Sequence, residues 1–261
     1  KCEESWIRLF RLWRAALQLS VHADTKVLTK HLNRIQRKQI PFAVSVALND
    51  TAHNARTAVY VTMRRVFSNP TTYTVPKNIL KKKSRTGSLY LRPSNKKDWT
   101  AEVGIKDFGK GAALHYLLPH IQGGGRKPKL SEAAMRRSGV IGGNRYITPA
   151  DVSKNKHGNV TKGTMTKILS GVKSLPGAAK GSVNRQKNKH FIMRLGGRGS
   201  ETGIWERTSK TKIKKLFNVT SRQPKYRKLF DFEKIVTKTM NKRYTRNFKK
   251  ALDHALRTAK P

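Results

Sequence analysis

The excess of basic side chains is the feature that most limits how this chain can fold. The sequence contains 57 Lys and Arg residues against 14 Asp and Glu residues, so its formal net charge is +43. A folded surface with this charge repels itself and is best tolerated beside an acidic partner, of which nucleic acid is the commonest. An acidic protein surface is the second candidate partner, and an anionic membrane is the third.

The length and the apolar content predict one or two domains with a modest core. The chain has 261 residues, of which 36% are hydrophobic. The single cysteine, Cys2, cannot form an internal disulfide or a zinc site by itself, which fits a reducing compartment. No run of about 18 apolar residues is present, so no membrane-spanning helix is expected.

Apolar side chains recur with helical spacing in three long stretches. Residues 1–20 predict a basic amphipathic helix, and we treat 1–25 as a segment separate from the main body. This helix fits docking on its own protein or on a neighbouring subunit, with a membrane surface as the alternative. A second helix is expected over 40–67, with Pro41 in its first turn, and a third from Tyr226 or Phe230 to Thr258.

Alternating apolar residues predict strands in two groups, separated by the middle of the chain. A loop over 94–98 joins the first two strands. With the long helices, these strands favour an α+β domain over 26–261 in which an antiparallel sheet packs against the long helices. The expected strands are 88–93, 100–108, 191–195, 203–208 and 212–219.

The middle of the chain gives weaker signals. Residues 111–121 predict a short helix or turn broken by Pro119, and 129–139 predict a helix with Ser131 as N-cap and Gly139 as its C-terminal stop. Residues 140–187 are rich in Gly, Lys, Asn and Ser. We expect them to form a flexible basic segment, with one short helical run, that becomes ordered on a partner.

Cofactor loops are not indicated by the glycine-rich stretches. Residues 123–125 are three glycines, but the spacing and the Ser or Thr of a phosphate-binding Walker A loop are missing. The stretch 196–203 does not have the spacing of a dinucleotide-binding loop. His115 and His120 lack a nearby Cys or carboxylate to complete a zinc site. We therefore predict no cofactor and no metal.

The sequence gives little sign of carboxylates that could hold catalytic metal ions. Asp98, Glu102 and Asp107 lie near one another in the sequence, as do Asp231 and Glu233. A nuclease would need such groups to hold metal ions. Among so many lysines and arginines, ion pairs are the expected role, and a nuclease is kept only as an alternative.

Basic residues that cluster in the sequence are the candidate contacts for DNA or for an acidic partner. The pattern is dispersed, which favours contact with a backbone of phosphates over recognition of bases. The candidates are Lys81, Lys82, Lys83, Arg85, Arg126, Lys127, Lys129, Arg136 and Arg137, with Lys242, Arg243, Arg246, Lys249 and Lys250 on the last helix.

Five stretches together resemble the minor tail protein Z, or tail-completion, group of long-tailed phages. The resemblance covers about Leu28 to Lys260, and its motifs are specific as a set rather than singly. The stretches are VSVALNDTAHNAR (44–56), HYLLPHIQGGGRKPKLSEAAMRRSG (115–139), DVSKNKHGNVTKGTMTKILSGVKS (151–174), GIWERT (203–208) and the last helix over 231–260.

The resemblance implies a structural virion protein without enzymatic activity. Such a protein would complete the head-proximal end of the tail, as a ring of copies, after assembly in the host cytoplasm. Its partners would be tail-tube, tail-terminator or connector proteins, with the phage DNA end as a further candidate. The competing hypotheses are a sequence-nonspecific nucleic-acid-binding protein, either ribosome-like or nucleoid-associated, and a metal-dependent nuclease.

Overall fold

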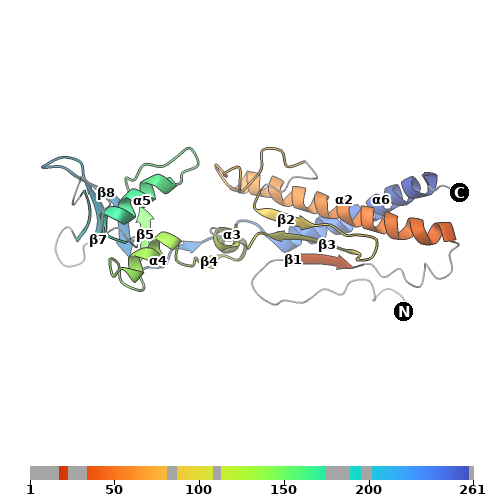
Figure 1. Cartoon of the computed structure of the whole chain (residues 1–261), viewed down its shortest axis with the longest axis horizontal. Coiled ribbons are helices and arrows are strands. Elements are labelled where there is room, and N and C mark those ends of the chain that lie inside the picture. The colour runs from red at the N-terminus through yellow and green to blue at the C-terminus, as the bar shows by residue number, and fades with distance from the viewer. Residues whose placement is uncertain are drawn as a thin grey trace. The chain divides into compact units, whose positions relative to one another are not determined.

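The computed structural model describes residues 18–22, 34–80, 87–107, 113–174, 189–194 and 202–258. It divides the chain into two compact units (Figure 1). Unit 1 comprises Lys1–Gly123 together with Arg227–Pro261, and unit 2 comprises Gly124–Tyr226. Both units combine helices with antiparallel strands, so the fold class is α+β, as the sequence predicted.

Two long helices form the centre of unit 1. Helix α2 spans Arg34–Val66, and α6 spans Phe232–Arg257 near the end of the chain. Alanines at their interface, Ala43 and Ala47 on α2 with Ala251 and Ala255 on α6, are all buried. Because alanine has a short side chain, the two helix backbones approach closely here.

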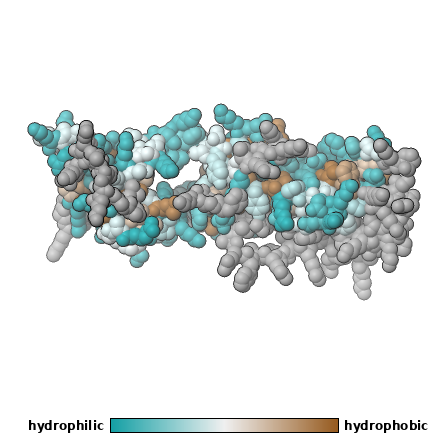
Figure 2. All heavy atoms as spheres, in the orientation of Figure 1, coloured by the Kyte–Doolittle hydropathy of each residue, from teal (hydrophilic) through white to brown (hydrophobic). Residues whose placement is uncertain are grey.

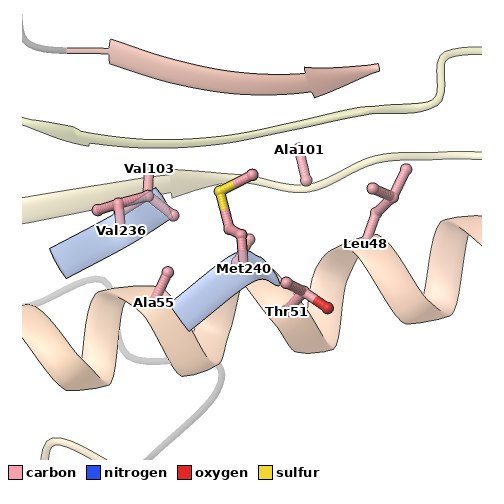
Figure 3. Close-up of a pocket in the computed structure, with 8 residues that line it drawn as sticks. Leu48, Thr51, Ala55, Ala101, Val103, Val236 and Met240 are labelled. Atoms are coloured by element: carbon pink, nitrogen blue, oxygen red, sulfur yellow. The ribbon is translucent and has the colours of Figure 1, made fainter. Parts of the chain in front are cut away.

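A three-stranded sheet packs against both helices. Strands β1 (Gln18–His22), β2 (Leu89–Arg92) and β3 (Thr100–Ile105) pair antiparallel in the order β1-β3-β2. Figure 3 shows Ala101 and Val103 of the central strand β3 facing α2 and α6. Their neighbours include Leu48 of α2 and Val236 of α6, and this contact forms most of the core of unit 1.

Helix α3 (Ala113–Gln122) adds a buried face to the same core. Leu114, Leu117 and Ile121 are buried on one side of it, at the spacing of an amphipathic helix. Pro119 lies inside α3 and does not break it, contrary to the prediction for 111–121. The following Gly123 has a positive φ of 81°, which a glycine adopts readily and which ends the helix.

Unit 2 is built on a four-stranded antiparallel sheet. Its strands are β5 (Tyr146–Pro149), β6 (His190–Arg194), β7 (Thr202–Arg207) and β8 (Ile213–Thr220), in the order β5-β8-β7-β6. Helices α4 (Leu130–Arg137) and α5 (Lys162–Gly171) lie on one side of this sheet (Figure 1). A short ribbon pairs β4 (Gly124–Gly125) with β9 (Lys225–Tyr226), where the chain enters and leaves the unit.

The first two helix predictions need correction. Residues 18–22 form strand β1, so a helix over 1–20 is wrong at its C-terminal end, and residues 1–17 lie outside the described part of the chain. Helix α2 begins at Arg34, which places Pro41 in its interior and not in its first turn. The predicted strands agree with β2, β3, β6, β7 and β8 to within a few residues.

The middle of the chain has more regular structure than its composition suggested. Residues 140–174 contain β5 and α5, and they bury Ile147, Ile168 and Leu169 in the core of unit 2. The rest of the expected flexible segment, residues 175–187, lies outside the described residues.

The ends of α4 differ from the prediction at one terminus. The N-cap is Lys129, and the Glu132 carboxylate accepts the backbone N–H of Lys129, so Ser131 is not the cap. Gly139 follows the helix with a φ of 69°, as expected for the residue that ends it.

Candidate polyanion-binding surface

Helix α6 is fixed in place by a cap, an apolar stripe and one polar bridge. The Asp231 side chain accepts the backbone N–H of Lys234 at 3.0 Å, which caps the first turn. Phe232 and Val236 are buried in the core of unit 1. Near the middle of the helix, the Asn247 amide donates to the Thr51 hydroxyl of α2 at 2.9 Å. These contacts determine which side of α6 faces solvent.

The solvent-facing side of α6 carries seven basic residues, which we call the α6 cationic surface. At 3.6 residues per turn they fall within about half of the helix circumference and extend over about 24 Å along its axis. All seven are exposed. They are Lys234, Lys238, Lys242, Arg243, Arg246, Lys249 and Lys250.

No acidic residue interrupts this surface along the helix. Between Glu233 and Asp253 the sequence of α6 contains neither Asp nor Glu. The Asp231 carboxylate lies just before the surface and is engaged, because Lys228 donates to it at 2.8 Å. This hydrogen bond, with that from the Lys234 backbone, lowers the pKa of Asp231. The acidic residues of α6 are Glu233 and Asp253, at the two ends of this surface, so most of the seven cations repel one another without an anion between them, and a bound polyanion would relieve that repulsion.

The five basic residues predicted on the last helix, Lys242 to Lys250, all belong to this surface. The sequence prediction omitted Lys234 and Lys238. Their i, i+4 spacing with Lys242 and Arg246 is the signal that would have identified them, because residues four apart are neighbours on a helix. The prediction for Lys81, Lys82, Lys83 and Arg85 falls outside the described residues.

Arg126 is not a surface contact, which corrects the prediction for this residue. Its guanidinium donates to both carboxylate oxygens of Glu132, at 2.6 and 2.5 Å, and both side chains are buried. Glu132 also accepts the backbone N–H groups of Lys129 and Ile147, at 2.7 and 2.9 Å. A buried charge needs such a partner, so Arg126 has a structural role.

The pKa values of this pair follow from the same contacts. Burial alone raises the pKa of Glu132, but the Arg126 guanidinium and the two backbone N–H groups outweigh it, and the net shift is downward. The hydrogen bonds to Glu132 raise the pKa of Arg126. Both groups are therefore charged at neutral pH, and they fix the start of α4 to the edge strand β5.

The other basic residues predicted near α4 have mixed environments. Lys127, Lys129 and Arg137 are exposed. Arg136 is half-buried: its guanidinium donates to the carbonyl oxygen of Arg145 at 2.7 Å and lies 4.9 Å from the centre of the Tyr146 ring. Lys127, Lys129 and Arg137 are thus available to a partner, whereas Arg136 is already engaged within unit 2.

The carboxylates considered for a nuclease do not form a metal site in the described part of the chain. Glu102 lies 3.6 Å from Arg92 in an ion pair, and Asp231 is the helix cap bonded to Lys228, so both have the ion-pair role that the sequence suggested. Among the described residues, no group of three or more His, Cys, Asp or Glu side chains is placed to hold a metal ion.

The hollow shown in Figure 3 is also unsuited to catalysis. It lies between β3, α2 and α6, and its lining is apolar except for Thr51, whose hydroxyl accepts from Asn247. It contains no titratable side chain.

On the face seen in Figure 2, the described residues are mostly hydrophilic, with hydrophobic ones in small separate patches.

Within the described residues, no helix is both long enough and apolar enough to cross a membrane. Comparisons of the chain with family models, with curated proteins and with solved structures gave no match. The α6 cationic surface is therefore the site whose own geometry says most about what this chain binds.

Proposed function

We propose that this chain is a non-enzymatic structural protein that docks on polyanions through the α6 cationic surface. The observation that carries the proposal is the arrangement of seven exposed cations along about 24 Å of one rigid helix, with no acidic residue between them. Phosphates spaced regularly along a DNA duplex match such a row, and each contact releases bound counterions.

The biological setting in this proposal comes from the sequence resemblance to phage tail-completion proteins. In that setting the chain is a virion component at the head-proximal end of the tail, present as a ring of copies. The α6 cationic surface would contact the phage DNA end or the acidic surface of a tail-tube, tail-terminator or connector protein. One of the five stretches of resemblance, 115–139, covers most of α3 together with β4 and α4.

A sequence-nonspecific nucleic-acid-binding protein is the second candidate function. The observation that favours it is the spread of exposed cations beyond α6, since Lys127, Lys129 and Arg137 of unit 2 are also exposed. Such a protein would bind DNA of any sequence with a strong dependence on salt. It would do so as a monomer and without recognising tail proteins.

Two measurements separate these candidates. The first is assembly, followed by electron microscopy, of the purified chain alone and with the tail-tube protein of the same phage genome. Rings, or attachment to tube ends, would support the tail role, and a monomer that binds only DNA would support the second function. The second is the gene neighbourhood: tail-tube and tail-terminator genes would support the tail role, whereas ribosomal-protein genes would contradict it.

The contact surface itself is tested with a variant in which Lys242, Arg243, Arg246, Lys249 and Lys250 are all changed to Gln. Its control changes five exposed lysines elsewhere, namely Lys97, Lys154, Lys156, Lys167 and Lys210, to Gln. Both variants lose the same charge. A larger loss of duplex-DNA affinity in the α6 variant supports the proposed surface, and equal losses contradict it.

A further inference from the structure

The four-stranded sheet of unit 2 has two unlike faces. Its first face packs Ile147, Ile204 and Phe217 against Met135 of α4 and Ile168 of α5, and all of these side chains are buried. Because side chains alternate along a strand, the residues between them point to the opposite, second face. Figure 1 shows α4 and α5 on the same side of this sheet.

Strand pairing aligns aromatic and basic residues on the second face. Phe191 of β6 pairs with Trp205 of β7, and Trp205 pairs with Lys215 of β8. A bulge at this point inserts Leu216 into β8. It lets Leu216 and Phe217 both enter the core while Lys215 stays beside Trp205 on the second face. Phe191, Trp205 and Lys215 thus form one row across three strands, and all three are only half-buried.

Trp205 is held in a defined position on this face. Its indole N–H donates to the carbonyl oxygen of Met193 at 3.2 Å. The residue beside it is Gly203, where an added Cβ would lie 2.9 Å from the indole nitrogen and 2.7 Å from Cε of Lys215. Because glycine has no Cβ at position 203, the Trp205 ring and the aliphatic part of Lys215 can lie across the sheet backbone at this point. A ring fixed in this way loses little conformational freedom when it binds a partner.

Each aromatic ring of the row has its own cation. The Lys215 ammonium lies 5.7 Å from the centre of the Trp205 ring, and the Arg207 guanidinium lies 5.7 Å from the centre of the Phe191 ring. Both distances are within the range of a cation–π contact. The surroundings are poor in acid: the only acidic residues in the sequence of unit 2 are Glu132, Asp151, Glu201 and Glu206. Of these, Glu206 alternates to the first face and pairs with Lys189.

We propose that this second face binds single-stranded nucleic acid, with bases stacked on Trp205 and Phe191 and phosphates contacted by Lys215 and Arg207. Every base has a π face, so stacking on aromatic rings in a cationic setting is tolerant of sequence. A duplex hides its base faces and gains nothing from the two rings. The site therefore differs from the α6 cationic surface, which lies on unit 1 and contacts charge alone.

The experiment measures binding of a fluorescein-labelled 20-nucleotide oligo(dT) to the full chain by fluorescence anisotropy, beside a duplex of equal length. Trp205→Ala is expected to weaken oligo(dT) binding about tenfold and to leave duplex binding unchanged. Trp205→Phe is expected to recover most of the affinity, because a smaller ring still stacks. Ile213→Ala is the matched control: Ile213 pairs with Arg207 on the same face, is 38% exposed and has no ring.

Two further measurements make the result decisive. Intrinsic tryptophan fluorescence should be quenched by oligo(dT), and this quenching should fall in Trp205→Phe but persist in Trp99→Phe, which alters an indole in unit 1. Lys215→Gln should lower the salt slope of oligo(dT) binding by about 0.7. The proposal is overturned if Trp205→Ala binds oligo(dT) like the wild type, or if it loses oligo(dT) and duplex affinity equally. The α6 five-residue variant should lower duplex affinity, whereas Trp205→Ala should lower oligo(dT) affinity. A failure of one proposed site can therefore be told apart from a failure of the other.

Discussion

Arg126 and Glu132 form a buried bidentate ion pair that joins the start of α4 to the edge of the sheet in unit 2. The two hydrogen bonds measure 2.6 and 2.5 Å, and Glu132 accepts two backbone N–H groups besides. A basic residue that the sequence placed among the partner contacts is thus part of the internal structure.

Removing Arg126 should destabilise unit 2 strongly. Arg126→Met leaves the Glu132 carboxylate buried without its counter-charge, a change that typically costs about 3–5 kcal/mol. The measurement is urea unfolding followed by circular dichroism. Arg137→Met is the control, because Arg137 is an exposed neighbour on α4, and it should change stability by less than about 0.5 kcal/mol. Similar small losses in both variants would contradict the structural role of Arg126.

The same pair predicts a stability change at acid pH. The folded-state pKa of Glu132 is below the ordinary value of 4.5. Its contribution is therefore complete above that value and is lost as the pH falls through the lower, folded-state pKa. The stability difference between the wild type and Glu132→Gln should be flat from pH 7 to pH 5 and should shrink below pH 4.5. A stability difference that grows toward low pH would contradict the downward shift of the Glu132 pKa in the folded state.

Asp231 should stabilise α6 as a cap more than as a charge. Asp231→Ala removes the acceptor for the Lys234 N–H and should cost about 1 kcal/mol. Asp231→Asn keeps a capping oxygen and should stay close to the wild type, because the ion pair with Lys228 is exposed and such pairs contribute little. Thermal unfolding of the three proteins checks this. If Asp231→Asn lowers the stability as much as Asp231→Ala does, the stabilisation comes from the charge of Asp231 and not from its role as the cap.

The alanine interface between α2 and α6 should not tolerate a larger side chain. Ala255 is fully buried beside Ala43 and Ala47, so Ala255→Leu should force the helices apart and cost about 1–3 kcal/mol. Leu256, the next residue, is 49% exposed, and Leu256→Ala serves as the control with a small expected effect. Urea unfolding measures both, and a neutral Ala255→Leu would mean that the interface is looser than the structure shows.

The parts of this fold that could be predicted are those whose signals are local. The apolar stripe of α6 and the alternating residues of β7 each repeat within a few residues, so their types and approximate bounds follow from the sequence. Five of the seven cations of α6 could also be predicted, because lysines and arginines outside the apolar stripe of a surface helix face solvent.

The parts that could not be predicted depend on distant partners. Strand β1 exists through its pairing with β3, about 80 residues away, whereas its own neighbourhood has helical periodicity. The burial of Arg126 requires Glu132 and the edge of β5 at Ile147, which no local pattern reveals. Pro41 is normally a sign that a helix begins, but α2 contains it internally and is supported by its packing against α6 and the sheet.

The most direct test of the central claim is the salt dependence of duplex-DNA binding by the wild type and the α6 five-residue variant. Each phosphate contact contributes about 0.9 to the slope of log affinity against log salt concentration. If the five cations contact phosphates, the slope should fall by about 3–5 in the α6 variant and by less than about 1 in the control variant with five lysines changed elsewhere. Equal slopes for the two variants would contradict the assignment of α6 as the polyanion-binding surface.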